Sequence, residues 1–119
     1  MSKTASGRVG EQIAFQFLVK SGYKIIARNF RTKMGEIDLV ALEDGCLVFV
    51  EVKARWSREF GLPEEAINQA KLASISRVGE IFRMKQRGLP PGSRIDVVAI
   101  ELNNGGKPER IEIIKSVTS

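Results

Sequence analysis

Two acidic side chains and a lysine occur at a spacing that suits metal-dependent chemistry. Asp38 lies in one predicted strand, and Glu51 and Lys53 lie two positions apart in the next. If the two strands pair so that Asp38 faces Glu51, the carboxylates repel each other, at a cost that grows where water is excluded. A divalent cation between them offsets this cost, and hard oxygen ligands on rigid strands suit Mg²⁺ or Mn²⁺.

The predicted pairing of these strands comes from the turn between them. Segments 35–43 and 46–54 flank Asp44-Gly45, a dipeptide typical of a two-residue hairpin turn. A turn centred there pairs Glu43 with Cys46, and counting back places Asp38 opposite Glu51 on one face. The other face then carries only apolar side chains: Ile37, Leu39, Ala41, Val48, Val50 and Val52.

Two alternatives accompany this interpretation. Glu36 falls opposite Lys53 in the same register, so it is either a second metal ligand or, as we favour, the ion-pair partner of that lysine. The carboxylates of Asp38 and Glu51 could also be solvated at a sheet edge. Segment 46–54 is very apolar and precedes a crossover, which instead favours a place inside the sheet.

The composition limits the available chemistry. Histidine is absent, which excludes Ser-His and Cys-His nucleophile pairs and histidine zinc sites. The single cysteine, Cys46, cannot form an internal disulfide, so the reducing cytoplasm is the expected compartment. The apolar runs are too short for a membrane span, so no membrane partner is expected. The net charge is +5, with basic blocks on both sides of an acidic middle, as expected for a cation site that attracts polyanions or for an unevenly charged solvated surface.

The periodicity predicts an α/β fold in which a mixed central sheet is flanked by helices, in the order α-β-β-β-α-β-β. The helices are expected at 6–21 and 63–87, and the strands at 23–30, 35–43, 46–54, 93–102 and 109–115. A helical crossover between the third and fourth strands predicts that these two are parallel. The length suits one domain, residues 1–119, with flexible ends at 1–5 and 116–119.

An Asp in one strand followed by Glu-x-Lys in the next resembles the PD-(D/E)xK phosphodiesterase superfamily, with its three-layer restriction-endonuclease-like fold. Over nearly the whole chain the sequence also resembles the YraN-type family of small bacterial proteins, which is similar in fold to archaeal Holliday-junction resolvases. The motifs that carry this resemblance are Gly7-x-x-Gly10-Glu11, Arg28-Asn29-Phe30-Arg31, Gly35-Glu36-Ile37-Asp38, Val48-Phe49-Val50-Glu51-Val52-Lys53-x-Arg55 and Arg94-x-Asp96-Val97-Val98. Ile37 stands where the superfamily's name has proline, a position at which many members differ.

The resemblance implies roles for the matching residues. Asp38 and Glu51 would hold Mg²⁺ or Mn²⁺ together with the carbonyl of Val52. Lys53 would lie near the attacking water and the scissile phosphate, where it stabilises negative charge or helps to deprotonate the water. Glu11 matches an acid that superfamily members bring to the metal from outside the sheet; without the resemblance it would be an ordinary acid at a helix N-terminus.

The expected substrate is DNA, branched or single-stranded, with hydrolysis of its phosphodiester bonds. The alternative is a non-catalytic nucleic-acid-binding module that keeps the nuclease fold, and a third possibility is a scaffold that binds neither DNA nor metal. A resolvase-like role would favour a homodimer, although the sequence shows no clear dimer seam. The candidate phosphate contacts, each of which could equally serve solubility, are Arg28, Arg31, Lys33, Arg55 and Lys71.

Three residues outside the motif have simpler expected roles. Trp56 and Phe60 follow the candidate site and could stack on an unpaired base, but anchoring their loop to the core is the favoured interpretation. Asp96 lies in a strand that reads as buried, so we expect it to pair with an arginine such as Arg94 rather than to act in catalysis.

Overall fold

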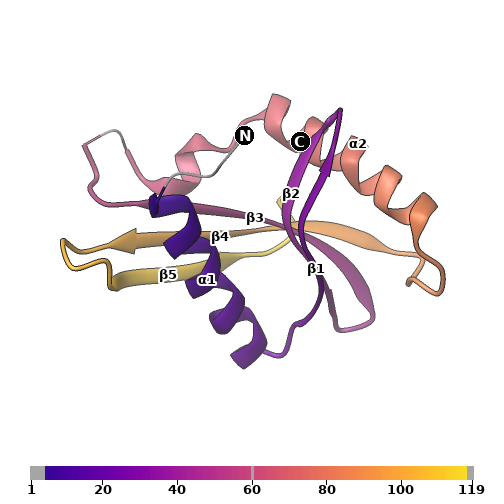
Figure 1. Cartoon of the computed structure of the whole chain (residues 1–119), viewed down its shortest axis with the longest axis horizontal. Coiled ribbons are helices and arrows are strands. Elements are labelled where there is room, and N and C mark those ends of the chain that lie inside the picture. Colours follow the sequence, from indigo (N-terminus) through magenta and orange to yellow (C-terminus); the bar gives the residue numbers. More distant parts are fainter. Residues whose placement is uncertain (1–4, 60, 118–119) are drawn as a thin grey trace.

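The computed structural model describes residues 5–59 and 61–117 and has the predicted α/β order, with one short additional helix. Its elements are α1 (Ala5–Lys20), β1 (Lys24–Thr32), β2 (Gly35–Glu43), β3 (Cys46–Arg55), the 3₁₀ helix η1 (Pro63–Ala66), α2 (Gln69–Lys85), β4 (Ser93–Leu102) and β5 (Pro108–Ile114) (Figure 1). The α/β class and the order predicted from periodicity are therefore confirmed.

The five strands form one mixed sheet in the order β1-β2-β3-β4-β5. Each strand pairs antiparallel with its neighbour except β3 and β4, which are parallel and are joined through α2, as predicted. The apolar strands β3 and β4 lie inside the sheet, where both of their faces are covered, so the candidate residues on β3 are not at an edge.

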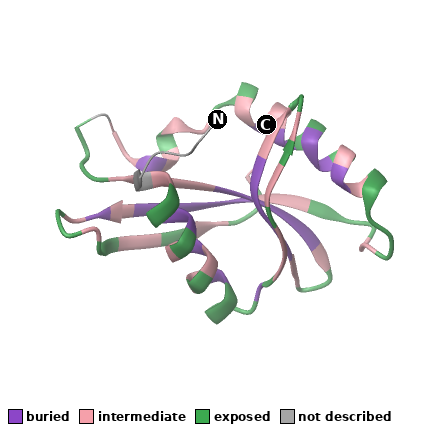
Figure 2. Ribbon diagram, viewed as in Figure 1, coloured by how far each residue is buried: buried purple, intermediate pink, exposed green. Residues whose placement is uncertain are grey.

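The two long helices cover opposite faces of the sheet and complete a three-layer arrangement (Figure 1). On the α1 side, Leu18 packs with Val48 and Ile100, and on the α2 side Phe82 packs with Phe49 and Val40. Figure 2 shows the buried residues following the strand centres and the inner faces of both helices. The β1–β2 hairpin extends beyond the rest of the sheet and lies beside α2 (Figure 1).

The predicted single helix over 63–87 is wrong in one respect, because the chain divides there into η1 and α2. Ile67 has an extended backbone, and Asn68 then begins a new helix by accepting a hydrogen bond from the backbone N–H of Lys71 at 2.9 Å. The acids of η1 serve local contacts: Glu65 accepts from the Leu62 backbone N–H at 2.6 Å, and Glu64 pairs with Arg110.

Residues near both ends of the described chain belong to or contact elements of the fold. The backbone N–H of Ser116 donates to Asp96 Oδ1 at 3.0 Å, and that of Val117 donates to the Ile95 carbonyl at 2.8 Å. These two residues of the predicted flexible end are therefore attached to β4, and Ala5 is the first described residue of α1. The remaining predicted flexible positions, 1–4 and 118–119, and the loop residue Phe60 lie outside the described residues.

Neither helix in the described part of the chain is long and apolar enough to cross a membrane.

Candidate active site

The hairpin register predicted from Asp44-Gly45 is confirmed near the turn and ends just before the acids. The β2–β3 ladder runs from the pair Glu43–Cys46 to the pair Leu39–Val50. It does not continue to Asp38 and Glu51; instead the backbone N–H of Val52 donates to Asp38 Oδ2 at 2.8 Å. The carboxylate of Asp38 thus bridges the two strands where their backbones stop pairing.

Strand β2 also changes face at Asp38. Leu39 packs in the core on the α1 side, whereas Ile37, two residues earlier, packs on the α2 side. The prediction that these two side chains share a face is therefore wrong. The physical reason is that β2 leaves β3 here while it stays paired with β1 as far as Thr32–Gly35, so the alternation of a regular strand does not persist.

Glu51 is the most deeply buried acid of the site, since only 3% of its surface is exposed. Its Oε2 lies 3.3 Å from Lys71 Nζ and 3.8 Å from Lys53 Nζ. Burial and the nearby charge of Asp38 nevertheless raise the pKa of Glu51 to about 7, because together they outweigh the two lysines. Asp38 is itself only 8% exposed, so the two carboxylates lie close together in a site with little water.

Lys71 has a more central place than the sequence indicated. The spacing predicted only a candidate phosphate contact on the long helix, yet the structure puts its ammonium group closer to Glu51 than that of Lys53. This position follows from the start of α2 at Asn68, which places Lys71 in the first turn of the helix, within reach of Glu51 on β3.

Glu11 reaches the sheet through a close contact between α1 and β3. A Cβ on Gly10 would lie 2.6 Å from Ala54 Cβ, so this approach depends on glycine. Glu11 is 5% exposed, and its Oε1 accepts a hydrogen bond from Asn29 Nδ2 at 2.7 Å. In the β1–β2 ladder, Asn29 of β1 and Asp38 of β2 lie between the same two residue pairs. The contact between Glu11 and Asn29 therefore borders the site.

Asn29 is a site residue that sequence reasoning missed. The motif that contains it gave this position no role, and among residues 5–59 and 61–117 its buried Oδ1 has no hydrogen-bond partner. Its φ is 53°, a left-handed conformation that asparagine adopts more readily than most residues. An asparagine inside an otherwise apolar and basic strand was the available signal, because asparagine is depleted in strands.

The side chains of the site suit a hard divalent ion with two carboxylate ligands. Asp38 and Glu51 are buried acids whose mutual repulsion a cation would relieve, as the raised pKa of Glu51 indicates. Within residues 5–59 and 61–117, no three Cys, Asp or Glu side chains gather closely enough to hold one ion. Glu11 is therefore not brought into the same ligand cluster, and a further protein ligand would have to be a backbone oxygen such as that of Val52.

Apart from Lys71, the predicted basic residues do not contact the acids of the site in the described part of the chain. Arg28 lies over the ring of Phe15 on α1, at 4.5 Å from its centroid, and donates to Gln12 at 3.2 Å. Lys33 is exposed in the turn between β1 and β2. Arg55 ends β3 on the other side of the site.

Glu36 is neither placed opposite Lys53 nor brought into an acidic cluster. Its Oε1 accepts from Arg31 Nε at 2.7 Å, across the β1–β2 ladder in which the two residues are partners. The favoured expectation of a pair with Lys53 is not what the structure shows, because β2 has already left β3 at this point.

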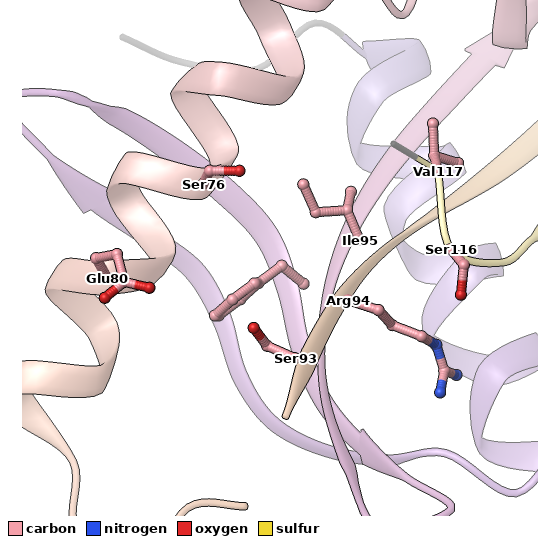
Figure 3. Close-up of a pocket in the computed structure, with 8 residues that line it drawn as sticks. Ser76, Glu80, Ser93, Arg94, Ile95, Ser116 and Val117 are labelled. Atoms are coloured by element: carbon pink, nitrogen blue, oxygen red, sulfur yellow. The ribbon is translucent and has the colours of Figure 1, made fainter. Parts of the chain in front are cut away.

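A further buried acid lies on β4 and has the arginine partner predicted for it. Asp96 is fully buried and accepts from Tyr23 Oη at 2.7 Å and from Arg94 Nε at 3.0 Å. Close by, a cavity of about 430 Å³ lies between α2 and β4, with Ser76 and Glu80 on the helix side (Figure 3). Arg94 borders this cavity, but its charge is matched by Asp96 and by Glu43, 2.5 Å away.

Comparisons with known proteins identify relatives over nearly the whole chain. Residues 10–100 match the sequence profile described as the uncharacterised protein family UPF0102. A UPF0102 protein of Caldicellulosiruptor saccharolyticus is 43% identical over 116 residues, which cover 98% of each chain. One from Symbiobacterium thermophilum is 46% identical over 101 residues, covering 85% of this chain and 86% of its own. The expected membership of the YraN-type family is thereby confirmed.

Proposed function

We propose that this chain, which belongs to the uncharacterised protein family UPF0102, is a metal-dependent nuclease that hydrolyses phosphodiester bonds in DNA, with branched or single-stranded DNA as the expected substrate. The observation that carries the proposal is the pair of buried carboxylates, Asp38 and Glu51, beside the ammonium groups of Lys53 and Lys71. Acids placed at such a cost in stability are characteristic of functional sites.

Each residue has a role that follows from its position. Asp38 and Glu51, with the backbone carbonyl of Val52, would hold Mg²⁺ or Mn²⁺. When bound, such an ion polarises a phosphoryl oxygen and lowers the pKa of its water. Lys53 would neutralise negative charge on the phosphate during attack, because its ammonium group lies near Glu51 and its side chain is 31% exposed.

Two further residues would act on the site from outside the ligand pair. The ammonium group of Lys71 lies 3.3 Å from Glu51 and would bind a phosphate oxygen once a cation takes over that carboxylate. Glu11 would be a positioning residue, since it holds the side chain of Asn29 across the ladder from Asp38.

The likeness to the PD-(D/E)xK superfamily supports the same function. The helix-three-strands-helix-strand order, and an Asp in β2 followed by Glu-x-Lys in β3, are the features on which that resemblance rests. The likeness in fold is an analogy, so the residues of the site carry the proposal.

The test is a cleavage panel with linear, single-stranded, flapped and four-way DNA in Mg²⁺ and in Mn²⁺. We expect cleavage by the wild type and a loss in Asp38→Asn greater than the roughly 10- to 100-fold that removal of an outer-shell partner costs. Asp44→Asn is the matched control, because Asp44 is an exposed acid in the turn of the same hairpin, with a φ of 52° that asparagine also adopts.

The possible failures separate the alternatives. Equal cleavage by Asp38→Asn and the wild type would contradict the assigned site. Salt-sensitive DNA binding without metal-dependent cleavage would favour the non-catalytic binding module. If calorimetry with Mn²⁺ gave no heat and no DNA bound, the chain would instead be a scaffold for other partners.

A further inference from the structure

A second polar cavity lies beyond the end of β3, next to the candidate active site. It has a volume of about 360 Å³, and its lining includes Arg55, the last residue of β3, Trp56 and Arg58 in the following loop, and Glu101 and Arg110 on β4 and β5. Arg55 follows Lys53 by two residues along the same strand, so their Cα atoms are about 7 Å apart and both side chains project from the same face.

The arginines of this cavity differ in how their charges are matched. Arg58 forms a two-bond contact with Glu101, at 2.5 and 3.1 Å. Arg110 pairs with Glu64, at 2.5 Å, and also with Glu101. These two guanidinium groups are therefore engaged by carboxylates of the chain itself.

Arg55 has no such partner. Among the described residues, 5–59 and 61–117, none forms a hydrogen bond or an ion pair with its guanidinium group, and its Nε is buried. A buried donor without an acceptor is unfavourable, so its persistence calls for an explanation. A phosphate oxygen would supply both the missing acceptor and the missing negative charge.

Trp56, the next residue, does not anchor its loop in the way the sequence analysis favoured. Its side chain is 43% exposed, and it belongs to neither core cluster. The indole lies against Gly106, where an added Cβ would be 3.5 Å from the ring, so one side of the indole is supported by the turn between β4 and β5. A supported but exposed indole is suited to stacking on a flat ligand.

We propose that Arg55 and Trp56 form a binding subsite for an unpaired nucleotide of the DNA strand, in which Arg55 binds the phosphate and Trp56 stacks on the base. This inference rests on the proposed nuclease function and specifies its substrate. The face of a base is free for stacking on a side chain only where the strand is single, so the subsite selects single-stranded DNA or the unpaired arms of a branched molecule over a continuous duplex.

Trp56 is the only tryptophan in the chain, so its fluorescence reports directly on this subsite. The experiment titrates the Asp38→Asn protein, in which cleavage is blocked, with a twelve-residue oligothymidine and with a closed duplex hairpin. We expect the oligothymidine to quench the fluorescence and the duplex to leave it nearly unchanged, while fluorescence anisotropy of labelled DNA measures the binding of both.

Variants test the two residues separately. Trp56→Leu is expected to weaken oligothymidine binding roughly 5- to 100-fold, the loss that follows removal of one stacking aromatic, with a much smaller effect on the duplex. Arg55→Gln is expected to weaken oligothymidine binding as well, because a charge-assisted contact with a phosphate is lost. Trp56→Phe should recover most of the affinity, and Arg58→Gln is the matched control because that arginine already has a carboxylate partner. Thermal melting of each variant verifies that it is folded.

The outcomes distinguish this subsite from the proposed nuclease. Oligothymidine binding without a change in Trp56 fluorescence, or equal quenching by the duplex, would overturn the subsite even if the wild type cleaves DNA. Selective quenching by the oligothymidine, together with no cleavage by the wild type, would support the subsite while the catalytic proposal fails.

Discussion

The sheet holds buried acids in two regions, and the surroundings of these acids differ. Asp96 on β4 is fully buried and receives hydrogen bonds from Tyr23 Oη, from Arg94 and from the Ser116 backbone N–H. At the candidate active site Glu51, 3% exposed, and Asp38, 8% exposed, are instead placed near each other.

The difference shows which acid serves the fold and which is suited to binding. The negative charge of Asp96 is matched by donors that the chain provides, and the hydrogen bond from Arg94 raises the pKa of that guanidinium. Around Glu51 the two nearby lysines do not compensate for burial and for the charge of Asp38, so its pKa is raised to about 7. A cation from solution would complete the second region, whereas the first needs none.

The largest expected effect is a loss of stability when the ion pair between Arg94 and Asp96 is removed. Arg94→Met leaves Asp96 buried without its cation, and removal of one partner of a buried ion pair costs about 3–5 kcal/mol. We expect urea denaturation to show a loss of this size in the free energy of unfolding. DNA cleavage by the molecules that remain folded should be unchanged, because the substitution is remote from Asp38.

Asp38→Asn makes the opposite change and is the contrast to Arg94→Met. It relieves the repulsion on Glu51 and keeps the size of the side chain, so the metal-free protein should be as stable as the wild type or more stable. If Asp38→Asn proved as destabilising as Arg94→Met, the two regions would not differ in the way the contacts indicate.

The extent to which the sequence predicted the site follows from the local signals in each segment. Asp44-Gly45 set the register of β2 with β3 correctly, because a two-residue turn determines its pairing directly. The same counting failed beyond Leu39, since the separation of β2 from β3 depends on its pairing with β1 and on the left-handed conformation of Asn29. No local pattern in the hairpin itself encodes either influence.

Contacts between distant elements were the least predictable part. The sequence predicted one helix from residue 63, whereas α2 begins after the Asn68 cap. The contact of Lys71 with Glu51 depends on that later start and on the packing of α2 over β3. Pairing of Asp96 with Arg94 was predicted because a buried acid needs a partner, whereas the additional bond from Tyr23 was not.

The next effect in size is a pH dependence that belongs to the second region alone. The pKa of Glu51 in the fold is about 7, above the 4.5 of an unperturbed glutamate, so between these values the folded state binds more protons than the unfolded state. The stabilisation from this group is fully present below pH 4.5 and is lost as the pH rises through 7. Without metal, the wild type should lose on the order of 2 kcal/mol between pH 5 and pH 8 relative to Glu51→Gln.

The comparison with Glu51→Gln isolates this group from Glu43, Glu64 and Glu101, whose lowered pKa values act in the opposite direction in both proteins. Mn²⁺ at pH 8 should restore stability to the wild type and leave the variant unchanged, because a ligand stabilises only the state that binds it. If the free energy of unfolding of the two proteins changed in parallel with pH, the pKa of Glu51 would not be raised in the fold.

The smallest effect tests whether Lys71 competes with a cation for Glu51. The ammonium group is 3.3 Å from the carboxylate and the lysine side chain is 36% exposed, which limits its contribution to that of a partly solvated ion pair. Lys71→Met should therefore strengthen Mn²⁺ binding only about two- to five-fold, measured by calorimetry at pH 8.5, where Glu51 is ionised. Binding of DNA in the presence of the metal should weaken, since a phosphate contact is lost.

Lys85→Met, at the exposed far end of the same helix, is the control and should change neither Mn²⁺ binding nor DNA binding. Weaker Mn²⁺ binding in Lys71→Met would instead mean that this lysine supports the metal-binding geometry of Glu51 rather than competing for its charge.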